Sequence, residues 1–544
     1  MIRPAITRAR NYLQQVNWPL LLFLVLVLNV KMIVKLAALV LFLLYNRKRL
    51  SPRLFFHQRF TWFYAAMIGL VIINTAGQVR SLSDNYLFAA AVAVFFWLLC
   101  IAAAALTSWY VKTTETEKLH ATLTVFFLLN IAVTAGQLLY IIIDSGSVNP
   151  YRYQGMYQKY FINTGDRITG IVLDVSTTNA LICSFGLVYF LSRNRILPVL
   201  LSMAAMLLTT SNFANLLLVA VLLILFIFQS TRPQKSLIVV CLAMLVFFLA
   251  RVTPQNDRYV RGIMNRVSGI RDSTKPAVPD QRPVTEKPDS ILGPEEKRKK
   301  IALLYLDSLY IATRHTAGAD TAAQEGTADL TKKPGIPQPS IHSAPFQRRK
   351  DTSDYQRELF AYGEATDPSF NSSLQQSARR SLPGKALAFR QTVQYFRQHP
   401  LKIITGTGAG NFSSKLAFRA TGLRMAGGYP KRFVYTHPDF VKNHLDLFLV
   451  YFSRDQELHS LINTPNAVYD QLLAEYGLAG IGCFFFLYLG FFKTGIKRGT
   501  YGLPLLLLLL GAFGTEYWFE QLSVVILFEL MMLVNIRETG KLHE

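Results

Sequence analysis

The sequence predicts an all-α membrane protein, a polytopic bundle of about 12 transmembrane helices with one large extracytoplasmic loop. Hydrophobic residues make up 51% of the 544 residues, and 38 Phe and 25 Tyr are present. The mean hydropathy of +0.27 is high for a chain of this length. The apolar runs are continuous, whereas the strands of a β-barrel would alternate apolar and polar residues. A helical bundle is therefore the expected fold.

Several apolar runs are long enough to cross about 30 Å of hydrocarbon, which needs about 20 helical residues. These predicted spans are 60–79, 86–108, 121–143, 174–192, 213–230, 235–252 and 466–492. Shorter apolar segments lie at 18–29, 33–45, 196–210, 503–515 and 519–535.

The first apolar stretch, from Trp18 to Tyr45, is predicted to form two short helices. One long helix would place Lys31 and Lys35 near its middle. Each lysine there would cost about 2.5–3.5 kcal/mol on insertion scales. We therefore expect the helices to meet at these lysines.

Charge predicts the orientation of the bundle. Four short basic loops fall on one side of it: 46–59, 192–195, 230–235 and 493–500. By the positive-inside rule that side is the cytoplasm. We expect a bacterial inner-membrane protein with an uncleaved basic N-terminus and both termini in the cytoplasm.

This orientation divides the chain into an N-terminal transmembrane part (1–252), an extracytoplasmic loop (253–465) and C-terminal transmembrane helices (466–544). Within the loop, 272–300 and 316–350 contain few aromatic residues and are predicted to be disordered insertions. Apolar residues at helical spacing predict amphipathic helices at 297–315 and 385–398. Such helices pack on the bundle, on the lipid interface or simply against solvent.

The formal net charge of +24 suggests nucleic acid binding in a soluble chain. Here basic loops that set topology are the simpler explanation, and we expect membrane lipid, not nucleic acid, as the partner. All four cysteines lie in apolar spans, which favours neither a disulfide framework nor a zinc site. No acidic cluster or paired histidine has metal-ligand spacing, so we expect no metal and no cofactor.

Polar residues with regular spacing occur where the large loop returns to the membrane. The segment 459–480 reads HSLINTPNAVYDQLLAEYGLAG. It resembles the signature of the O-antigen ligase and polysaccharide polymerase superfamily, in which a His-Asn-type pair precedes an LLxExGxxG helix start. The residues that match the tail of this signature are Leu472, Leu473, Glu475, Gly477 and Gly480. Asn466 occupies the position of the family histidine, and Ala467 follows it.

Two further segments resemble the same superfamily. Residues 383–412 contain an Arg-bearing helix, a His-Pro break and the turn GTGAGNF. The glycines do not indicate a Rossmann fingerprint, because no βαβ unit surrounds them. Residues 166–180 contain an Arg-x-x-Gly element, with Arg167 and Gly170 in the matching positions.

The resemblance implies transfer of a glycan from a polyprenyl pyrophosphate to an acceptor hydroxyl, on a growing glycan or on lipid A core. Guanidinium groups suit the charge that builds on the departing pyrophosphate, and Arg167 and Arg390 hold the matching positions. His459, seven residues before Asn466, is the candidate to activate the acceptor, ahead of His437 and His444. Asn466 is instead a candidate to orient the hydroxyl.

Glu475 is a candidate for acid–base work, although a carboxylate one turn into a helix is also stabilised by the helix dipole. Two other function classes stay open. A transporter or flippase would place ionisable groups near the midplane, where only Glu529 falls well inside a span. A noncatalytic scaffold of polysaccharide assembly is the other alternative.

Overall fold

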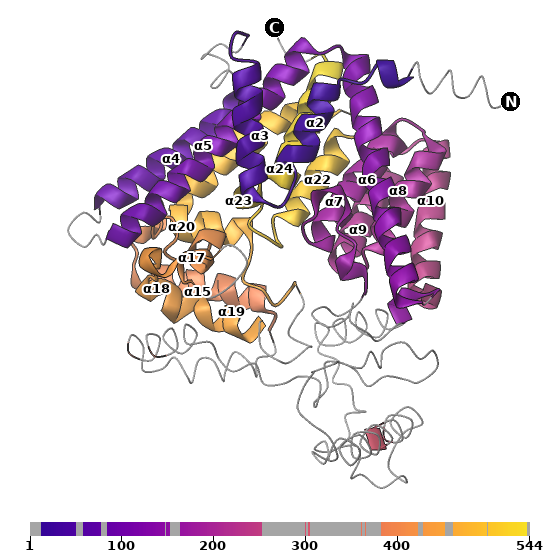
Figure 1. Cartoon of the computed structure of the whole chain (residues 1–544). Helices are drawn as coiled ribbons and strands as arrows, with labels where there is room; N and C mark the ends of the chain where they lie inside the picture. The colour runs from indigo at the N-terminus through magenta and orange to yellow at the C-terminus, as the bar shows by residue number, and fades with distance from the viewer. Residues whose placement is uncertain are drawn as a thin grey trace, which may run out of the picture. The chain divides into compact units, whose positions relative to one another are not determined.

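The computed structural model describes residues 12–49, 58–77, 84–146, 148–152, 164–252, 300, 303–304, 361, 365, 382–422, 428–451, 461–497 and 499–540. Every regular element within these residues is a helix, which confirms the predicted all-α class (Figure 1). The predicted insertions and the helix predicted at 297–315 lie outside the described residues, apart from 300, 303 and 304.

Five helical stretches are long and apolar enough to cross a membrane, as judged by length and composition. They are Arg59–Gly77 (α4), Asn85–Thr113 within Asp84–Thr113 (α5), Thr116–Ser145 (α6), Arg232–Val252 (α10 and a π-helical turn) and Val468–Gly495 (α20 and its extension). Shorter apolar helices are Trp18–Val27 (α2), Met32–Tyr45 (α3), Ser176–Ser192 (α7), Ile196–Leu208 (α8), Asn212–Phe228 (α9) and Gly502–Ala512 (α22). The apolar runs were therefore reliable guides to helix position, and the chain is a helical membrane protein.

The two-helix prediction for the first apolar stretch is confirmed. Helix α2 ends at Val27, and Lys31 is the N-cap residue of α3. Lys35 lies inside α3 and is buried. It is tolerated there because its ammonium donates a hydrogen bond to the backbone carbonyl of Gln521.

The core of the bundle forms around the last helix, Ser523–Glu538 (α24), in which every side chain from Ser523 to Ile536 is buried. Helices α5, α7 and α22 pack against it, and Figure 1 shows α24 enclosed by its neighbours. A short helix, Trp518–Gln521 (α23), precedes α24 and joins it to α22. This arrangement places a polar segment, 515–521, inside a largely apolar bundle.

Five small helices gather at one end of the bundle, next to α20 (Figure 1). They are Gly384–Gln398 (α15), Lys402–Thr405 (α16), Lys415–Ala420 (α17), Pro438–Asn443 (α18) and Leu445–Tyr451 (α19). The amphipathic helix predicted at 385–398 corresponds to α15, which buries Leu387, Ala388, Tyr395 and Phe396 along one face. These helices bring the loop motifs onto the membrane helices.

The chain forms two compact units. The first comprises Met1–Leu139, Gly165–Phe248 and Thr352–Glu544, and the second comprises Tyr140–Thr164 and Leu249–Asp351. The C-terminal part of the predicted extracytoplasmic loop thus belongs to the same unit as the bundle. All of the interactions described below lie within this first unit.

Candidate functional site

The glycine-rich turn of residues 406–410 packs directly on α20. The N–H of Thr407 donates to the carbonyl of Ala474 over 2.9 Å, and that of Gly408 to the carbonyl of Glu475 over 3.0 Å. Gly406 has a φ of 77°, and a Cβ at this residue would lie 2.3 Å from the backbone carbon of Glu475. Only glycine permits this approach. The two motif segments identified in the sequence therefore form one unit.

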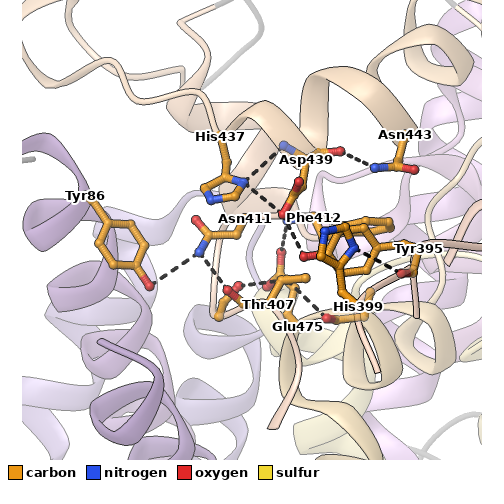
Figure 2. Close-up of polar contacts among 12 residues, drawn as sticks. Tyr86, Tyr395, His399, Thr407, Asn411, Phe412, His437, Asp439, Asn443 and Glu475 are labelled. Carbon is orange, nitrogen blue, oxygen red and sulfur yellow. Dashed lines mark hydrogen bonds and ion pairs between the residues drawn. The ribbon is translucent and has the colours of Figure 1, made fainter. Parts of the chain in front are cut away.

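The Glu475 carboxylate holds this turn in place. Its side chain is buried and accepts hydrogen bonds from the backbone N–H groups of Gly410 (3.0 Å), Phe412 (3.2 Å) and Ser413 (3.0 Å). Figure 2 shows the carboxylate beneath the turn. The acid in the first turn of α20 is Asp470 rather than Glu475. The dipole interaction expected for Glu475 was therefore wrong, because dipole effects fade beyond the first turn.

Asp470 is the centre of a second buried network. Its carboxylate accepts hydrogen bonds from the hydroxyls of Thr392 (2.7 Å) and Ser413 (3.2 Å). It also lies 2.9 Å from Nε2 of His444, a fully buried side chain. The Ser413 hydroxyl in turn lies 3.1 Å from the hydroxyl of Tyr517. These contacts tie α15, α20 and the segment before α23 into one polar core.

Asn466, in the position of the family histidine, contacts Glu516. Its amide nitrogen lies 3.0 and 3.2 Å from the two carboxylate oxygens of Glu516. The ammonium of Lys385 donates to the carbonyl of Asn466 and, over 3.2 Å each, to the Thr464 hydroxyl and the carbonyl of Thr515. Burial lowers the pKa of Lys385 to about 8, and Glu516 partly opposes this shift. Asn466 thus lies beside a cation and an anion.

A basic cluster, here defined as Lys35, Lys415 and Arg419, lies around α23. The Gln521 amide, oriented to satisfy both neighbours, donates to Asp174 over 3.1 Å and accepts from Lys415 over 3.1 Å. Lys35 interacts electrostatically with Asp174, Lys415 and Arg419. Three cations and Asp174 therefore meet at the Gln521 side of α23.

Glu520 lies on the same helix and connects it to α17 and α20. Its carboxylate accepts from the N–H of Leu416 over 3.0 Å and from the side chain of Gln471 over 2.5 Å. A small pocket adjoins this carboxylate and is lined by Ala93, Phe96, Trp97, Leu416, Tyr476, Phe519 and Glu520. The polar cluster thus borders an apolar recess.

The Arg-x-x-Gly element forms a rigid turn on α6 and α7. Gly170 has a φ of 64°, and a Cβ there would lie 2.4 Å from the Asn179 side chain. Its N–H donates to Gln137 over 2.8 Å, and the next N–H donates to Asn130 over 3.0 Å. Arg167 is exposed at the end of a short 3₁₀ helix, Thr164–Arg167 (η5). Asp174, a few residues on, links this element to the basic cluster through Gln521.

The structure brings together some of the predicted site residues and not others. Asn466 and Glu475 lie on or just before α20 within connected polar networks. Arg390 lies on the exposed face of α15. His459 lies outside the described residues. The functional roles of Arg390 and His459 therefore stay predictions.

His437, a weaker candidate, lies in a partly exposed polar group on α18. Its Nδ1 accepts from the N–H of Asp439 over 3.1 Å and is 3.5 Å from the Asp439 carboxylate. The Tyr395 hydroxyl donates to the same carboxylate over 2.8 Å (Figure 2). Burial lowers the pKa of His437, against the influence of Asp439. A neutral imidazole near the glycine-rich turn is thus available at neutral pH.

Segment 515–521 connects these polar networks, and it was not among the site residues predicted from the sequence. Its Tyr517, Glu520 and Gln521 reach the Asp470 network, α20 and the basic cluster, respectively. The available signal was a pair of carboxylates, Glu516 and Glu520, between two apolar runs. Charged side chains at that position need buried partners, and their presence indicates a polar interior.

Among the described residues, no group of three or more His, Cys, Asp or Glu side chains is placed to hold a metal ion. Comparison with known proteins gives no match to a family model, a curated protein or a solved structure.

Proposed function

We propose that this protein transfers a glycan from a polyprenyl-pyrophosphate carrier to an acceptor hydroxyl. It would act as an O-antigen ligase-like enzyme, with lipid A core as acceptor, or as a polymerase that extends a surface polysaccharide. We further propose about 12 membrane spans in a bacterial inner membrane, with both termini in the cytoplasm and the site on the opposite face.

One observation carries this proposal. The three segments that resemble the superfamily are far apart in the sequence, yet all three meet the segment 515–521 in one polar region. Asp174 and Gln471 contact α23 through Gln521 and Glu520, and Lys385, from the segment 383–412, donates to the carbonyl of Thr515. Independent structural roles for three motifs would not require a common meeting point.

The charges in this region suit the chemistry of the donor. Breaking the anomeric C–O bond leaves negative charge on a pyrophosphate, which guanidinium and ammonium groups stabilise. Lys415 and Arg419 lie on one short helix, and Arg167 lies in the turn that precedes Asp174. We propose that these cations bind the departing pyrophosphate, and that Arg167, the exposed one, is the first to contact it.

The acceptor hydroxyl needs a group that orients it or takes its proton. Asn466 already contacts Glu516, so its amide is held in a fixed position and suits hydrogen bonding to a hydroxyl. His437 is partly exposed and its lowered pKa favours the neutral form. Because Nδ1 accepts from the N–H of Asp439, the ring proton lies on Nε2, which can donate to the acceptor hydroxyl and orient it. His459 remains the candidate from the sequence.

The test is transfer by the purified protein in nanodiscs, given a labelled polyprenyl-pyrophosphate glycan and an acceptor. We expect longer or acceptor-linked glycan together with release of the carrier pyrophosphate. Arg167→Lys keeps the charge but loses the bidentate contact with phosphate, so the rate of glycan transfer should fall clearly without loss of folded protein. Arg195→Lys is the matched control, because Arg195 is also exposed but lies in a loop predicted to face the cytoplasm.

Two results would contradict the proposal. One is absence of glycan transfer by folded protein with both acceptor types. The other, for the role of the arginine, is wild-type turnover in Arg167→Lys.

Transport of a lipid-linked glycan is the second candidate, and one observation favours it. Glu529 is buried inside α24 and accepts hydrogen bonds from the hydroxyls of Tyr64 and Tyr488. Ionisable groups inside membrane spans often serve transport. Movement of the labelled donor across proteoliposomes without any transfer product would favour this function over the first.

A further inference from the structure

Helix α15 runs beside the start of α20 and ends in an exposed tip, here defined as residues 399–405. The contacts proceed in register: Lys385 meets Asn466, Thr392 meets Asp470, and Phe396 packs with Ala474. Within the tip, the carbonyl of Ile404 approaches Gly477 so closely that a Cβ on Gly477 would lie 2.4 Å from it. The position along α20 at which the tip makes contact therefore gives the depth of the tip in the membrane.

Helix α20 places the tip below the membrane surface. Lys493 is the first basic residue at the far end of this span. Counting back from Lys493, about 20 helical residues fill the hydrocarbon layer and reach Leu473. Leu478 follows Gly477, the residue that contacts Ile404. At about 1.5 Å per residue, Leu478 is then about 7 Å inside the layer.

Helix α4 gives the same depth independently. Arg59 begins this helix, and the Asn74 side chain donates to the carbonyl of Thr405 over 2.7 Å. Asn74 lies about 22 Å from Arg59 at about 1.5 Å per residue, short of the roughly 30 Å hydrocarbon thickness. Two helices thus place the tip in the outer part of the acyl-chain layer, about 7 Å below its boundary with the headgroups.

The side chains of the tip suit that boundary. Leu401 is 91% exposed and Ile404 is 64% exposed, and Leu478 beside them is 54% exposed. Arg397 and Lys402 flank these apolar residues, and no Asp or Glu occurs between residues 382 and 438. Long basic side chains at this depth extend to lipid phosphates while their stems lie along apolar surface.

We propose that the tip is inserted into the membrane leaflet nearest the site. Leu401 and Ile404 contact acyl chains, and Arg397 and Lys402 contact lipid phosphate groups. The glycine-rich turn that follows then lies at the edge of the hydrocarbon layer, where its backbone groups are satisfied by protein, as membrane burial requires. Asn74 and Glu475 supply such partners. This inference depends on the spans crossing a bilayer and not on glycan transfer.

The experiment measures the surroundings of spin labels on the full chain in phospholipid nanodiscs, after replacement of the four native cysteines. Leu401→Cys and Ile404→Cys carry the test labels. Leu478→Cys is the lipid-facing control. Ala386→Cys is the aqueous control, because Ala386 is exposed near the outer start of α15. Relaxation by oxygen, which partitions into lipid, is compared with relaxation by a water-soluble nickel chelate.

Both test labels should show a higher ratio of oxygen to chelate accessibility than Ala386→Cys, close to that of Leu478→Cys. A ratio at either test position equal to that of Ala386→Cys overturns the proposal. Should Leu401→Cys fail to give monodisperse protein, Pro400→Cys reports on the same exposed tip with the same two outcomes. A failure of the transferase assay leaves this result unaffected, so the two proposals are tested separately.

Discussion

Alanine at Gly477 should destabilise the protein more than any other single-methyl change in α20. Gly477 has φ 66° and ψ −163°, a region that is almost exclusive to glycine and costs another residue about 1–3 kcal/mol. The added Cβ would also lie 2.4 Å from the carbonyl oxygen of Ile404. Forcing these segments apart adds about 1–3 kcal/mol. The expected loss is therefore about 2–6 kcal/mol, out of a typical stability of about 5–15 kcal/mol.

Gly482→Ala is the matched control in the same helix. A Cβ at Gly482 meets nothing within 4 Å, and alanine gains up to about 1 kcal/mol over glycine in a regular helix. The assay is the apparent Tm of detergent-purified protein, together with the monodisperse fraction after heating. Gly477→Ala should melt well below wild type, and Gly482→Ala at or above it. Equal melting of the two variants would refute the close contact between the glycine-rich turn and α20.

Three further predictions concern different parts of the chain. Glu475→Ala leaves three buried N–H groups without an acceptor, so the free energy of unfolding should fall by at least about 3 kcal/mol. Exposed Glu117→Ala, in the first turn of α6, should lower it by about 1 kcal/mol at most, and a similar small loss in both variants would contradict the role of Glu475 in holding the glycine-rich turn. The pKa of Lys385 is about 8 in the folded protein against an ordinary 10.5. The unfolded chain therefore binds more protons between these two values, and the stability of the wild-type protein should rise with pH across that window. Unfolding measured from pH 7 to 10.5 should show no such rise in Lys385→Met, and parallel pH profiles of the two proteins would argue against a buried ammonium. Protease added outside the inner membrane should cut within 320–345 and leave 46–59 intact, and the reverse pattern would invert the proposed orientation.

The positions of the helices could be predicted from the sequence because they depend on local properties. A run of apolar residues satisfies its own backbone only as a helix, so the spans predicted at 60–79 and 466–492 closely match Arg59–Gly77 and Val468–Gly495. The break between α2 and α3 was equally predictable, because a lysine in mid-span is costly. The sequence also identified 406–410 and 466–475 as segments of interest.

The partners within the site were decided by the tertiary structure alone. Nothing in the sequence indicates that the carboxylate of Glu475 faces the backbone of Gly410 to Ser413, or that Asn466 contacts Glu516. Such pairs join residues far apart in the chain, and backbone N–H groups of every residue type are equivalent donors. The sequence by itself therefore determined which segments form apolar helices and which carry polar chemistry. Only the packed fold decided which carboxylate meets which donor, because a buried charge takes its partner from whatever the neighbouring helices bring within reach.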